Sequence, residues 1–250
     1  MPAVKTALPD FLRSRFSPTG RYGLRLTLFA LATLLVGIPF SFLLVQVTSE
    51  GPLTVTDIEV AERIHEVILG SDFLIGLAHV LSFLGSPPWF YLTVGGAALF
   101  FYRRNDRRIA LYLVATNLLG GAIDTVMKVL VDRPRPELEQ PITHAFGKSF
   151  PSGHSMASTV GYGTLLLAFM PFIPRRRRPW AIVGYVLIVC LIALSRLALG
   201  VHFLSDVLGG IVLGASWLLV ATAAFSIWRR ERGKPTVEVI EGAEPEVAER

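Results

Sequence analysis

Long apolar stretches separated by short polar segments constrain this chain more than any other feature. The first of them, Leu26–Val47, runs for 22 residues without a charged side chain. At a rise of about 1.5 Å per residue, a helix of that length matches the roughly 30 Å hydrocarbon core of a bilayer. Five further stretches follow, at Pro88–Tyr102, Ile109–Val131, Met156–Ile173, Trp180–Leu199 and Val207–Trp228. The sequence therefore predicts an all-α membrane protein with six transmembrane helices.

The overall composition agrees with a chain that crosses a membrane several times. Hydrophobic residues make up 52% of the 250 residues and charged residues only 17%, whereas charged residues average about 25% in soluble domains. The net charge of +5 lies in short clusters between apolar stretches, which argues against a nucleic-acid partner. Because Cys190 is the single cysteine, a disulfide within the chain is excluded.

The region between the first two apolar stretches predicts interfacial helices. The apolar residues that share one helical face are Val60, Ala61, Ile64, Val67 and Ile68. The charged residues around them, Asp57 included, lie on other faces, a pattern typical of an amphipathic helix on the membrane surface. The apolar segment Phe73–Leu84 is too short to span comfortably, so we expect it to be interfacial or re-entrant.

Lysine and arginine are distributed unevenly around the predicted spans. If the N-terminus is cytoplasmic, 17 of the 24 basic residues fall on the cytoplasmic side, in residues 1–25, 103–108, 175–178 and 229–234. The positive-inside rule favours this orientation. We therefore expect a cytoplasmic N-terminal segment at 1–23, a six-span domain at 24–228 and a cytoplasmic polar tail at 229–250. The protein is expected in the plasma or inner membrane.

Three polar clusters interrupt the apolar pattern, and this topology puts all of them at the extracytoplasmic ends of spans. The first begins with Lys128 and continues through Arg133 and Arg135. Arginine binds phosphate as a planar fork and lysine binds it as a point charge, so the cluster suits anion recognition. A plainer interpretation is also open, in which Lys128 pairs with Asp124 one helical turn earlier and the arginines are solvated.

The second cluster is Pro151-Ser152-Gly153-His154, at the start of an apolar stretch. Ser152 is a natural N-cap, and the free N–H groups that follow favour an anion. Gly153 lets the backbone approach a ligand closely. His154 titrates near neutrality and can act as an acid or a base. The alternative is a capped helix with an interfacial histidine.

The third cluster combines Ser195-Arg196 with His202 and Asp206. His202 and Asp206 are four residues apart and so share a helical face. A carboxylate that accepts from one ring nitrogen fixes the tautomer and leaves the other nitrogen as a nucleophile or a ligand. The alternative is a solvated pair at a helix end.

Taken in order, the three clusters resemble the three-part signature of the type 2 phosphatidic acid phosphatase superfamily. The matching residues are Lys128, Arg135, Pro136, Pro151, Ser152, Gly153, His154, Ser195, Arg196, His202 and Asp206. Every signature position is matched with its spacing intact, and the six-span layout resembles the integral-membrane branch of the family. Two Arg-Pro pairs occur in tandem; the family spacing selects Arg135 and leaves Arg133 as a possible helper.

The resemblance implies a role for each residue. It implies that His202 attacks phosphorus and becomes a phosphohistidine, and that Asp206 orients the ring and stabilises its charge. It also implies that His154 protonates the leaving oxygen and then activates water. The phosphate-binding residues that it implies are Lys128, Arg135, Ser152, Gly153 and Arg196.

A metal site is the main chemical alternative, because His154, His202 and Asp206 could ligate zinc. Three cations that converge on the same place oppose a divalent ion and already supply the charge that a metal would bring. We therefore expect neither a metal nor a cofactor. The remaining histidines, His65, His79 and His144, are expected at the interface or in loops.

These observations predict a phosphoric monoester or diphosphate hydrolase that acts, without a metal, on a lipid at the extracytoplasmic face. The candidate substrates from the family are phosphatidic acid, phosphatidylglycerophosphate and polyprenyl diphosphate. The expected partners are the substrate lipid and the bilayer, and no nucleic acid. Two alternatives are a phosphatase of a soluble phosphoester and a non-enzymatic lipid-binding or transport protein. The intact pair of His154 and His202 argues against the last, because binding needs cations but no nucleophile.

Overall fold

The computed structural model describes residues 24–138 and 142–231; the predicted N-terminal segment 1–23 and most of the predicted tail 229–250 lie outside them. Within the described ranges the chain forms helices and no strand, which confirms the all-α prediction. The α-helices are α2 Leu24–Thr48, α3 Leu53–Leu69, α4 Asp72–Phe83, α5 Pro87–Arg103, α6 Arg107–Val131, α7 Gly153–Phe169, α8 Arg178–Ala198 and α9 Leu204–Glu231. Two short 3-10 helices, η1 Met170–Phe172 and η2 Arg175–Arg177, join α7 to α8.

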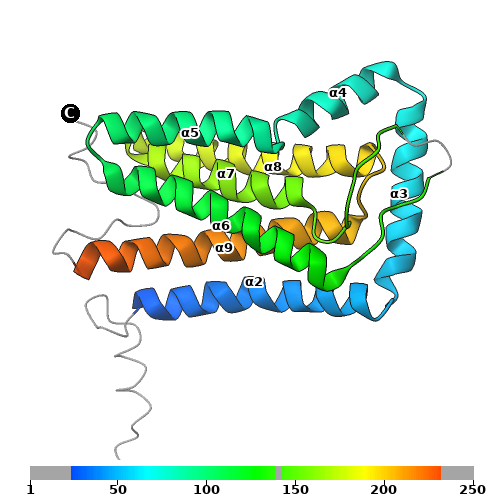
Figure 1. Ribbon diagram of the computed structural model, residues 1–250, viewed down its shortest axis with the longest axis horizontal. Coiled ribbons are helices and arrows are strands. Elements are labelled where there is room, and N and C mark those ends of the chain that lie inside the picture. Colours follow the sequence, from blue (N-terminus) through cyan, green and yellow to red (C-terminus); the bar gives the residue numbers. More distant parts are fainter. Residues whose placement is uncertain (1–23, 139–141, 232–250) are drawn as a thin grey trace, which may run out of the picture.

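Helices α2 and α5 to α9 run side by side, and α3 crosses one end of them (Figure 1). α7 is central, because it packs against α5, α6, α8 and α9. Small residues allow this close approach. A Cβ atom on Gly210 of α9, for example, would lie 2.5 Å from the carbonyl oxygen of Ser152, at the start of α7. The starts of α7 and α9 are therefore in direct backbone contact.

Four helical segments are long and apolar enough to cross a membrane, namely Arg107–Val131, Gly153–Phe172, Arg175–Ala198 and Leu204–Ser226. α3 and α4 pass the same test together but are bent by 120°, as a broken span or a re-entrant pair is. α5 has only 17 residues, and within α2 the apolar segment Gly37–Thr48 is shorter still. Four to five spans are thus supported among the described residues, and six spans stay a prediction.

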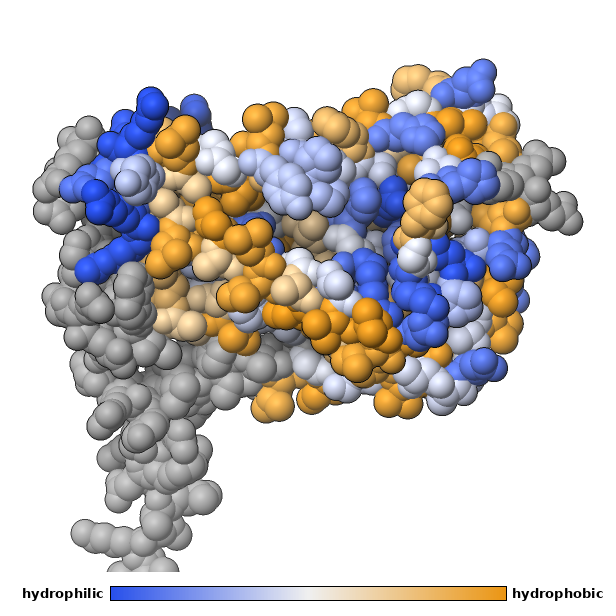
Figure 2. Space-filling model, viewed as in Figure 1, coloured by the Kyte–Doolittle hydropathy of each residue, from blue (hydrophilic) through white to orange (hydrophobic). Residues whose placement is uncertain are grey.

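Hydrophilic residues gather at the two ends of the molecule, with a hydrophobic region between them (Figure 2). The basic segments 103–108 and 175–178 lie at one end, whereas the loop residues 132–138 and 142–152 and the turn 199–203 lie at the other (Figure 1). The three polar clusters of the sequence therefore share one end of the bundle, opposite to these basic segments.

Residues with positive φ shape the loops at this end, Asp132 and Gly200 among them. Asp132 ends α6 with φ of 54°, and Gly200 follows α8 with φ of 69°. The left-handed region suits glycine, and a Cβ atom at Gly200 would also meet Leu138. These turns direct residues 133–138 and 201–206 back across the end of the bundle.

The buried face of α3 overlaps the predicted one only in part, at Ala61 and Ile68. Its buried residues are Asp57, Ala61, His65 and Ile68, whereas Val67 is 69% exposed. The expectation that His65 lies at the interface is therefore wrong, as is the assignment of Asp57 to an outer face. The reason is that α3 packs on α8 and α9, where the Asp57 carboxylate finds hydrogen-bond donors that compensate its burial.

Candidate active site

The polar clusters meet at the end of the bundle that α3 crosses. Lys128 lies in the last turn of α6, His154 in the first turn of α7 and Arg196 near the end of α8. Arg135 belongs to the loop after α6, and His202 to the turn before α9. His154 lies within electrostatic reach of the other four residues. The fold thus brings residues from five separate segments to one place.

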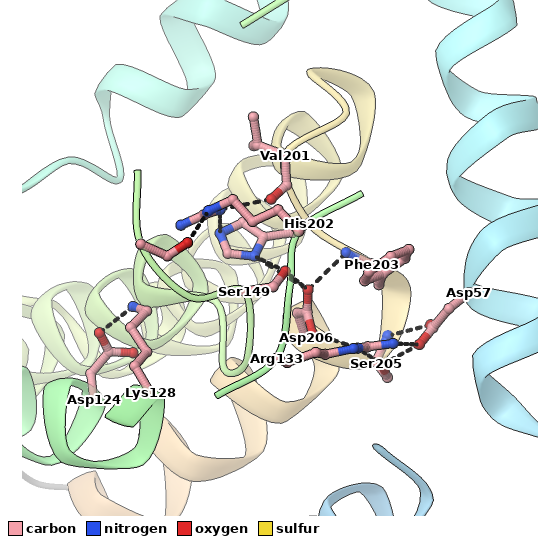
Figure 3. Close-up of polar contacts among 12 residues, drawn as sticks. Asp57, Asp124, Lys128, Arg133, Ser149, Val201, His202, Phe203, Ser205 and Asp206 are labelled. Atoms are coloured by element: carbon pink, nitrogen blue, oxygen red, sulfur yellow. Dashed lines mark hydrogen bonds and ion pairs between the residues drawn. The ribbon is translucent and has the colours of Figure 1, made fainter. Parts of the chain in front are cut away.

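His202 is 2% exposed, and its two ring nitrogens face different partners (Figure 3). Nδ1 lies 3.4 Å from Oδ2 of Asp206 and 3.4 Å from Oγ of Ser149. Nε2 lies 3.2 Å from Nη1 of Arg135. Because a guanidinium only donates hydrogen bonds, Nε2 accepts this one and carries the lone pair. The ring proton then sits on Nδ1, toward Asp206.

The surroundings of His202 keep its ring neutral. Burial lowers the pKa of His202 to about 4; the hydrogen bond and the charge of Asp206 oppose this effect, while Arg135 and Arg196 add to it. At neutral pH the ring is therefore unprotonated at Nε2. A nitrogen in that state has the electron pair that a nucleophile needs.

Arg135 is held beside His202 by backbone carbonyl groups. Its Nη1 donates to the oxygen of Val201 at 2.7 Å, and its Nε donates to the oxygen of Gly147 at 3.0 Å. Nη2 donates to the oxygen of Phe146 at 3.1 Å. These carbonyls carry no formal charge, so they fix the guanidinium while leaving its charge available for an anion.

Asp206 is fully buried and accepts several hydrogen bonds (Figure 3). Oδ2 accepts from the N–H of Phe203 at 2.9 Å and from the hydroxyl of Ser149. Oδ1 accepts from Nη1 of Arg133 at 2.6 Å. The carboxylate is thereby fixed on the Nδ1 side of the His202 ring.

Arg133, the first arginine of the tandem Arg-Pro repeat, binds the Asp206 carboxylate. Besides Asp206, Arg133 donates to Oγ of Ser205 at 2.7 Å and to Oδ2 of Asp57 at 2.7 Å. Its guanidinium also lies over the ring of Phe203, 4.3 Å from the centroid. The side chain of Arg133 is only 9% exposed, and both of its Nη nitrogens are engaged. Arg133 therefore supports Asp206 from a buried position.

Three members of this network were not predicted from the sequence: Asp57, Ser149 and Ser205. Asp57 lies about 70 residues before the signature in the chain, and helical periodicity put it on the wrong face. Ser205 directly precedes Asp206, and Ser149 lies two residues before Pro151. Serine is common in loops and at helix starts for reasons unrelated to function, so its position carried no distinguishing signal.

The start of α7 combines a hydroxyl, a glycine and a histidine. Ser152 occupies the predicted N-cap position, but its hydroxyl makes no capping bond and has no hydrogen-bond partner among the described residues. Its N–H donates to the carbonyl oxygen of Asp206 at 2.9 Å. A Cβ atom at Gly153 would lie 2.7 Å from Nζ of Lys128, so glycine is what lets the lysine approach. A helix start arranged in this way suits an anion.

The sequence left two partners open for Lys128, an anion or Asp124, and the structure shows the contact with Asp124. Its Nζ lies 2.5 Å from Oδ2 of Asp124, one helical turn earlier (Figure 3). The other carboxylate oxygen of Asp124 is buried and has no hydrogen-bond partner within residues 24–138 and 142–231. Any anion that binds Lys128 therefore competes with Asp124.

Arg196 approaches from α8 and is 6% exposed. Its Nη1 donates to the hydroxyl of Ser82 on α4, a further residue that the sequence did not indicate. Its Nε is buried without a hydrogen-bond partner in the described part of the chain. Arg196 thus keeps a donor to offer to a ligand.

A cavity of about 640 Å³ lies between α5, α6 and α7 and reaches Lys128 and His154. Its apolar walls include Phe90, Tyr91, Val94, Val114, Leu118 and Val160. Tyr91 is 73% exposed and Leu118 is 62% exposed, so the cavity opens on the flank of the bundle. An apolar space therefore leads from the side of the protein to three residues of the signature, Lys128, Gly153 and His154.

The remaining histidines, all within the described ranges, do not join the site as part of a metal-binding group. Among the residues that the structure describes, no three or more His, Cys, Asp or Glu side chains are grouped so as to hold a metal ion. His79 and His144 are exposed, and His65 is on the buried face of α3.

Known proteins are similar in sequence to the region of this chain that carries the signature. The profile of the PAP2 superfamily matches residues 109–230. Phosphatidylglycerophosphatase B of Bacillus subtilis is 34% identical over 150 residues, which cover 58% of this chain and 70% of that protein. A lipid A 1-phosphatase of Rhizobium etli is 32% identical over 124 residues, which cover 46% of this chain and 49% of that protein.

A solved structure shares the fold. The crystal structure of a transmembrane PAP2-type phosphatidylglycerolphosphate phosphatase from Bacillus subtilis superposes with a TM-score of 0.70 over 77% of this chain and 94% of that chain, at 23% identity. The relatives named above are lipid phosphatases, in accord with the expected phosphoric monoester hydrolase. The sequence match and the shared fold together establish that this chain is a membrane-integral member of the PAP2 superfamily.

Proposed function

We propose that this protein hydrolyses a lipid phosphate or diphosphate, without a metal ion, through a phosphohistidine at His202. The proposal rests on one contact, between Nε2 of His202 and Nη1 of Arg135 at 3.2 Å. A neutral nucleophilic nitrogen and a cation suited to phosphoryl oxygens face the same space. In phosphoryl transfer, positioning and charge stabilisation supply most of the catalysis.

In the first step, Nε2 of His202 attacks phosphorus, and the bond from phosphorus to the leaving oxygen breaks. His154 gives its proton to that oxygen. The lipid leaves as an alcohol, or as a monophosphate when the substrate is a diphosphate. Asp206 accepts from the Nδ1 proton and stabilises the positive charge that develops on the ring.

In the second step, a water molecule attacks the phosphorus of the phosphohistidine. His154 takes a proton from this water, and the bond between Nε2 and phosphorus breaks. The electron pair of that bond returns to Nε2, so inorganic phosphate leaves and neutral His202 is restored. His154 then holds the proton that the next cycle requires.

The phosphoryl oxygens are held by Lys128, Arg135, Arg196, the Ser152 hydroxyl and the Gly153 N–H. Buried donors without partners support this assignment, since Oγ of Ser152 and Nε of Arg196 make no hydrogen bond within the described residues. An unsatisfied buried polar group costs about 1–3 kcal/mol. A bound phosphate would remove that cost for both groups.

The cavity between α5, α6 and α7 supports a lipid as the substrate. Its volume of about 640 Å³ lies within the range of roughly 300–1,000 Å³ that is usual for small-molecule sites. An alkyl chain in this cavity would leave its phosphate beside Lys128 and His154. The names of the relatives, a phosphatidylglycerophosphatase and a lipid A 1-phosphatase, support the same substrate class.

The site faces the extracytoplasmic side, and both termini face the cytoplasm, in a six-span arrangement. The support is the position of the basic segments 103–108 and 175–178 at the opposite end of the bundle. A cysteine at Lys148, whose side chain is 45% exposed, placed in a Cys190→Ser background, should react with an impermeant thiol reagent on intact cells. Reaction only after lysis would overturn the orientation.

The function is tested with purified protein in detergent and with EDTA present. Release of phosphate is measured from phosphatidic acid, phosphatidylglycerophosphate, a polyprenyl diphosphate, glycerol phosphate and p-nitrophenyl phosphate. We expect the lipids to be hydrolysed with the highest kcat/KM, and His202→Ala to abolish both turnover and the acid-labile phosphoenzyme. Activity that survives in His202→Ala would exclude the nucleophile, and loss of activity on chelation would point to a metal.

A further inference from the structure

Asp57 joins α3 to the site through a set of buried hydrogen bonds that lies outside the signature (Figure 3). Its side chain is completely buried. Oδ2 accepts from Nη2 of Arg133 at 2.7 Å and from the hydroxyl of Ser205, and Oδ1 accepts from the N–H of Ser205 at 2.8 Å. A buried carboxylate is retained only where it is paired and hydrogen-bonded, and here both oxygens are engaged.

Arg133 connects this carboxylate to the catalytic pair. Its Nη2 is bound to Asp57 and its Nη1 to Oδ1 of Asp206, at 2.7 Å and 2.6 Å. Asp206 in turn faces Nδ1 of His202. A continuous chain of contacts therefore runs from α3 to the ring that the proposed reaction uses.

We propose that Asp57 is a positioning residue for phosphoryl transfer, which fixes Arg133 against Asp206 and shares the charge of its guanidinium. The inference rests on the proposed function, because it assigns Asp57 a part in that reaction. It extends the functional unit beyond the three signature motifs to α3.

Two physical effects make Asp57 matter to the chemistry. Without the negative charge of Asp57, Nη2 of Arg133 would be held less strongly and would turn toward Asp206 to form a two-pronged pair, which would draw the Asp206 carboxylate away from the His202 ring. Arg133 would also neutralise Asp206 fully. With Asp57 present, two carboxylates share one guanidinium, and the net negative charge stabilises the ring as it becomes positive on phosphorylation. In a buried site, where the effective dielectric constant is low, that charge has a large effect.

The test compares Asp57→Asn with Glu62→Gln, a matched control that removes one carboxylate charge from an exposed position of the same helix. The substrates are p-nitrophenyl phosphate and phosphatidylglycerophosphate. We expect Asp57→Asn to lower kcat roughly 10- to 100-fold, as the loss of residues that orient a catalytic group does. KM should stay unchanged, and the rate of phosphoenzyme formation should fall by the same factor as kcat. Glu62→Gln should resemble the wild type.

Several results would overturn the inference. One is an unchanged kcat in Asp57→Asn, and another is a change in KM alone. If Asp57→Asn had a lower melting temperature but the wild-type kcat per folded molecule, Asp57 would contribute to stability alone.

A second comparison covers the case in which Asp57→Asn does not fold. Arg133→Met is compared with the double variant Arg133→Met/Asp57→Asn, in which no ion pair between these residues is left half broken. Equal kcat values would support action through Arg133, and a further loss in the double variant would overturn it. A wild type that cleaves no phosphoester would overturn the proposed function itself, whereas an active wild type with an unaffected Asp57→Asn would overturn only this inference.

Discussion

Arg133 and Arg135, two residues apart in the chain, bind the two different members of one buried pair. Nη1 of Arg133 lies 2.6 Å from Oδ1 of Asp206, and Nη1 of Arg135 lies 3.2 Å from Nε2 of His202. The partners of Arg133 include two carboxylates, whereas the other partners of Arg135 are backbone carbonyls. The tandem Arg-Pro repeat thus contains one arginine for structure and one for the ligand.

The two arginines should therefore respond differently to substitution by methionine. Arg133→Met leaves two buried carboxylates without their cation, a change that costs about 3–5 kcal/mol in comparable buried pairs. Arg135→Met leaves only carbonyl groups and should change stability much less, while lowering kcat/KM about 100- to 1,000-fold. Thermal unfolding in detergent and steady-state kinetics measure both effects. Equal loss of stability in the two variants would contradict this division.

The pKa of His202 predicts where activity is lost in acid. Burial holds it at about 4, so the nucleophile is neutral above that pH and protonated below it. We expect the acidic limb of kcat/KM that belongs to His202 to lie near pH 4, far below the ordinary value of about 6.5. The unfolded chain binds a proton between these values and the folded chain does not, so stability should fall as the pH is lowered through this window. If the acidic limb of kcat/KM that belongs to His202 lay near pH 6.5 instead of pH 4, the prediction would be contradicted.

Ser149 should be a positioning residue, although no motif marks it. Its hydroxyl donates to Oδ2 of Asp206 and lies 3.4 Å from Nδ1 of His202. Ser149→Ala removes this donor, so we expect kcat to fall roughly 10-fold or more and KM to stay constant. Ser49→Ala is the control, because the Ser49 hydroxyl is exposed and donates to the carbonyl oxygen of Val45, at the end of α2. A change in both variants would indicate a general effect of losing a hydroxyl.

Asp124 should weaken anion binding at Lys128. The two side chains are in contact at 2.5 Å and border the cavity, so an incoming phosphate has to displace the carboxylate. Asp124→Asn should tighten the binding of orthovanadate, a phosphate mimic, roughly tenfold, or about 1.4 kcal/mol. Asp132→Asn is the control: it removes an equal charge from a carboxylate that is 66% exposed and paired with Lys148. Weaker vanadate binding in Asp124→Asn would show that Asp124 orients Lys128 for the ligand.

Sequence periodicity and motif spacing predict the structural features that depend on residues close together in the chain, such as helix length and contacts between residues four positions apart. The apolar stretch that forms α6 is long because a bilayer is thick. The contact of His202 with Asp206 follows from their spacing of four residues, although His202 lies in the turn before α9 and not in the helix itself. Asp57 was misplaced because its burial depends on Arg133, which lies 76 residues away. Patterns in one helix do not report such a partner. The contact of Lys128 with Asp124 was visible from their spacing of four, but which of its two possible partners Lys128 takes was not.

The cavity between α5, α6 and α7 can be tested with two adjacent glycines of α5. Gly95 lines the cavity and Gly96 does not, and a Cβ atom at either position has no neighbour within 4 Å. Leucine at either position should not destabilise the helix, because its helix propensity exceeds that of glycine. Gly95→Leu would fill space that an alkyl chain needs.

We therefore expect Gly95→Leu to lower kcat/KM for a long-chain phosphatidylglycerophosphate by about 10-fold or more. Hydrolysis of p-nitrophenyl phosphate should be unaffected, because that substrate has no alkyl chain to place. Gly96→Leu should leave both activities at the wild-type level. Equal effects of Gly95→Leu on the two substrates would mean that the cavity does not hold the lipid chain. The soluble phosphoester would then be the better candidate substrate, since the phosphate-binding groups do not distinguish a lipid from a soluble leaving group.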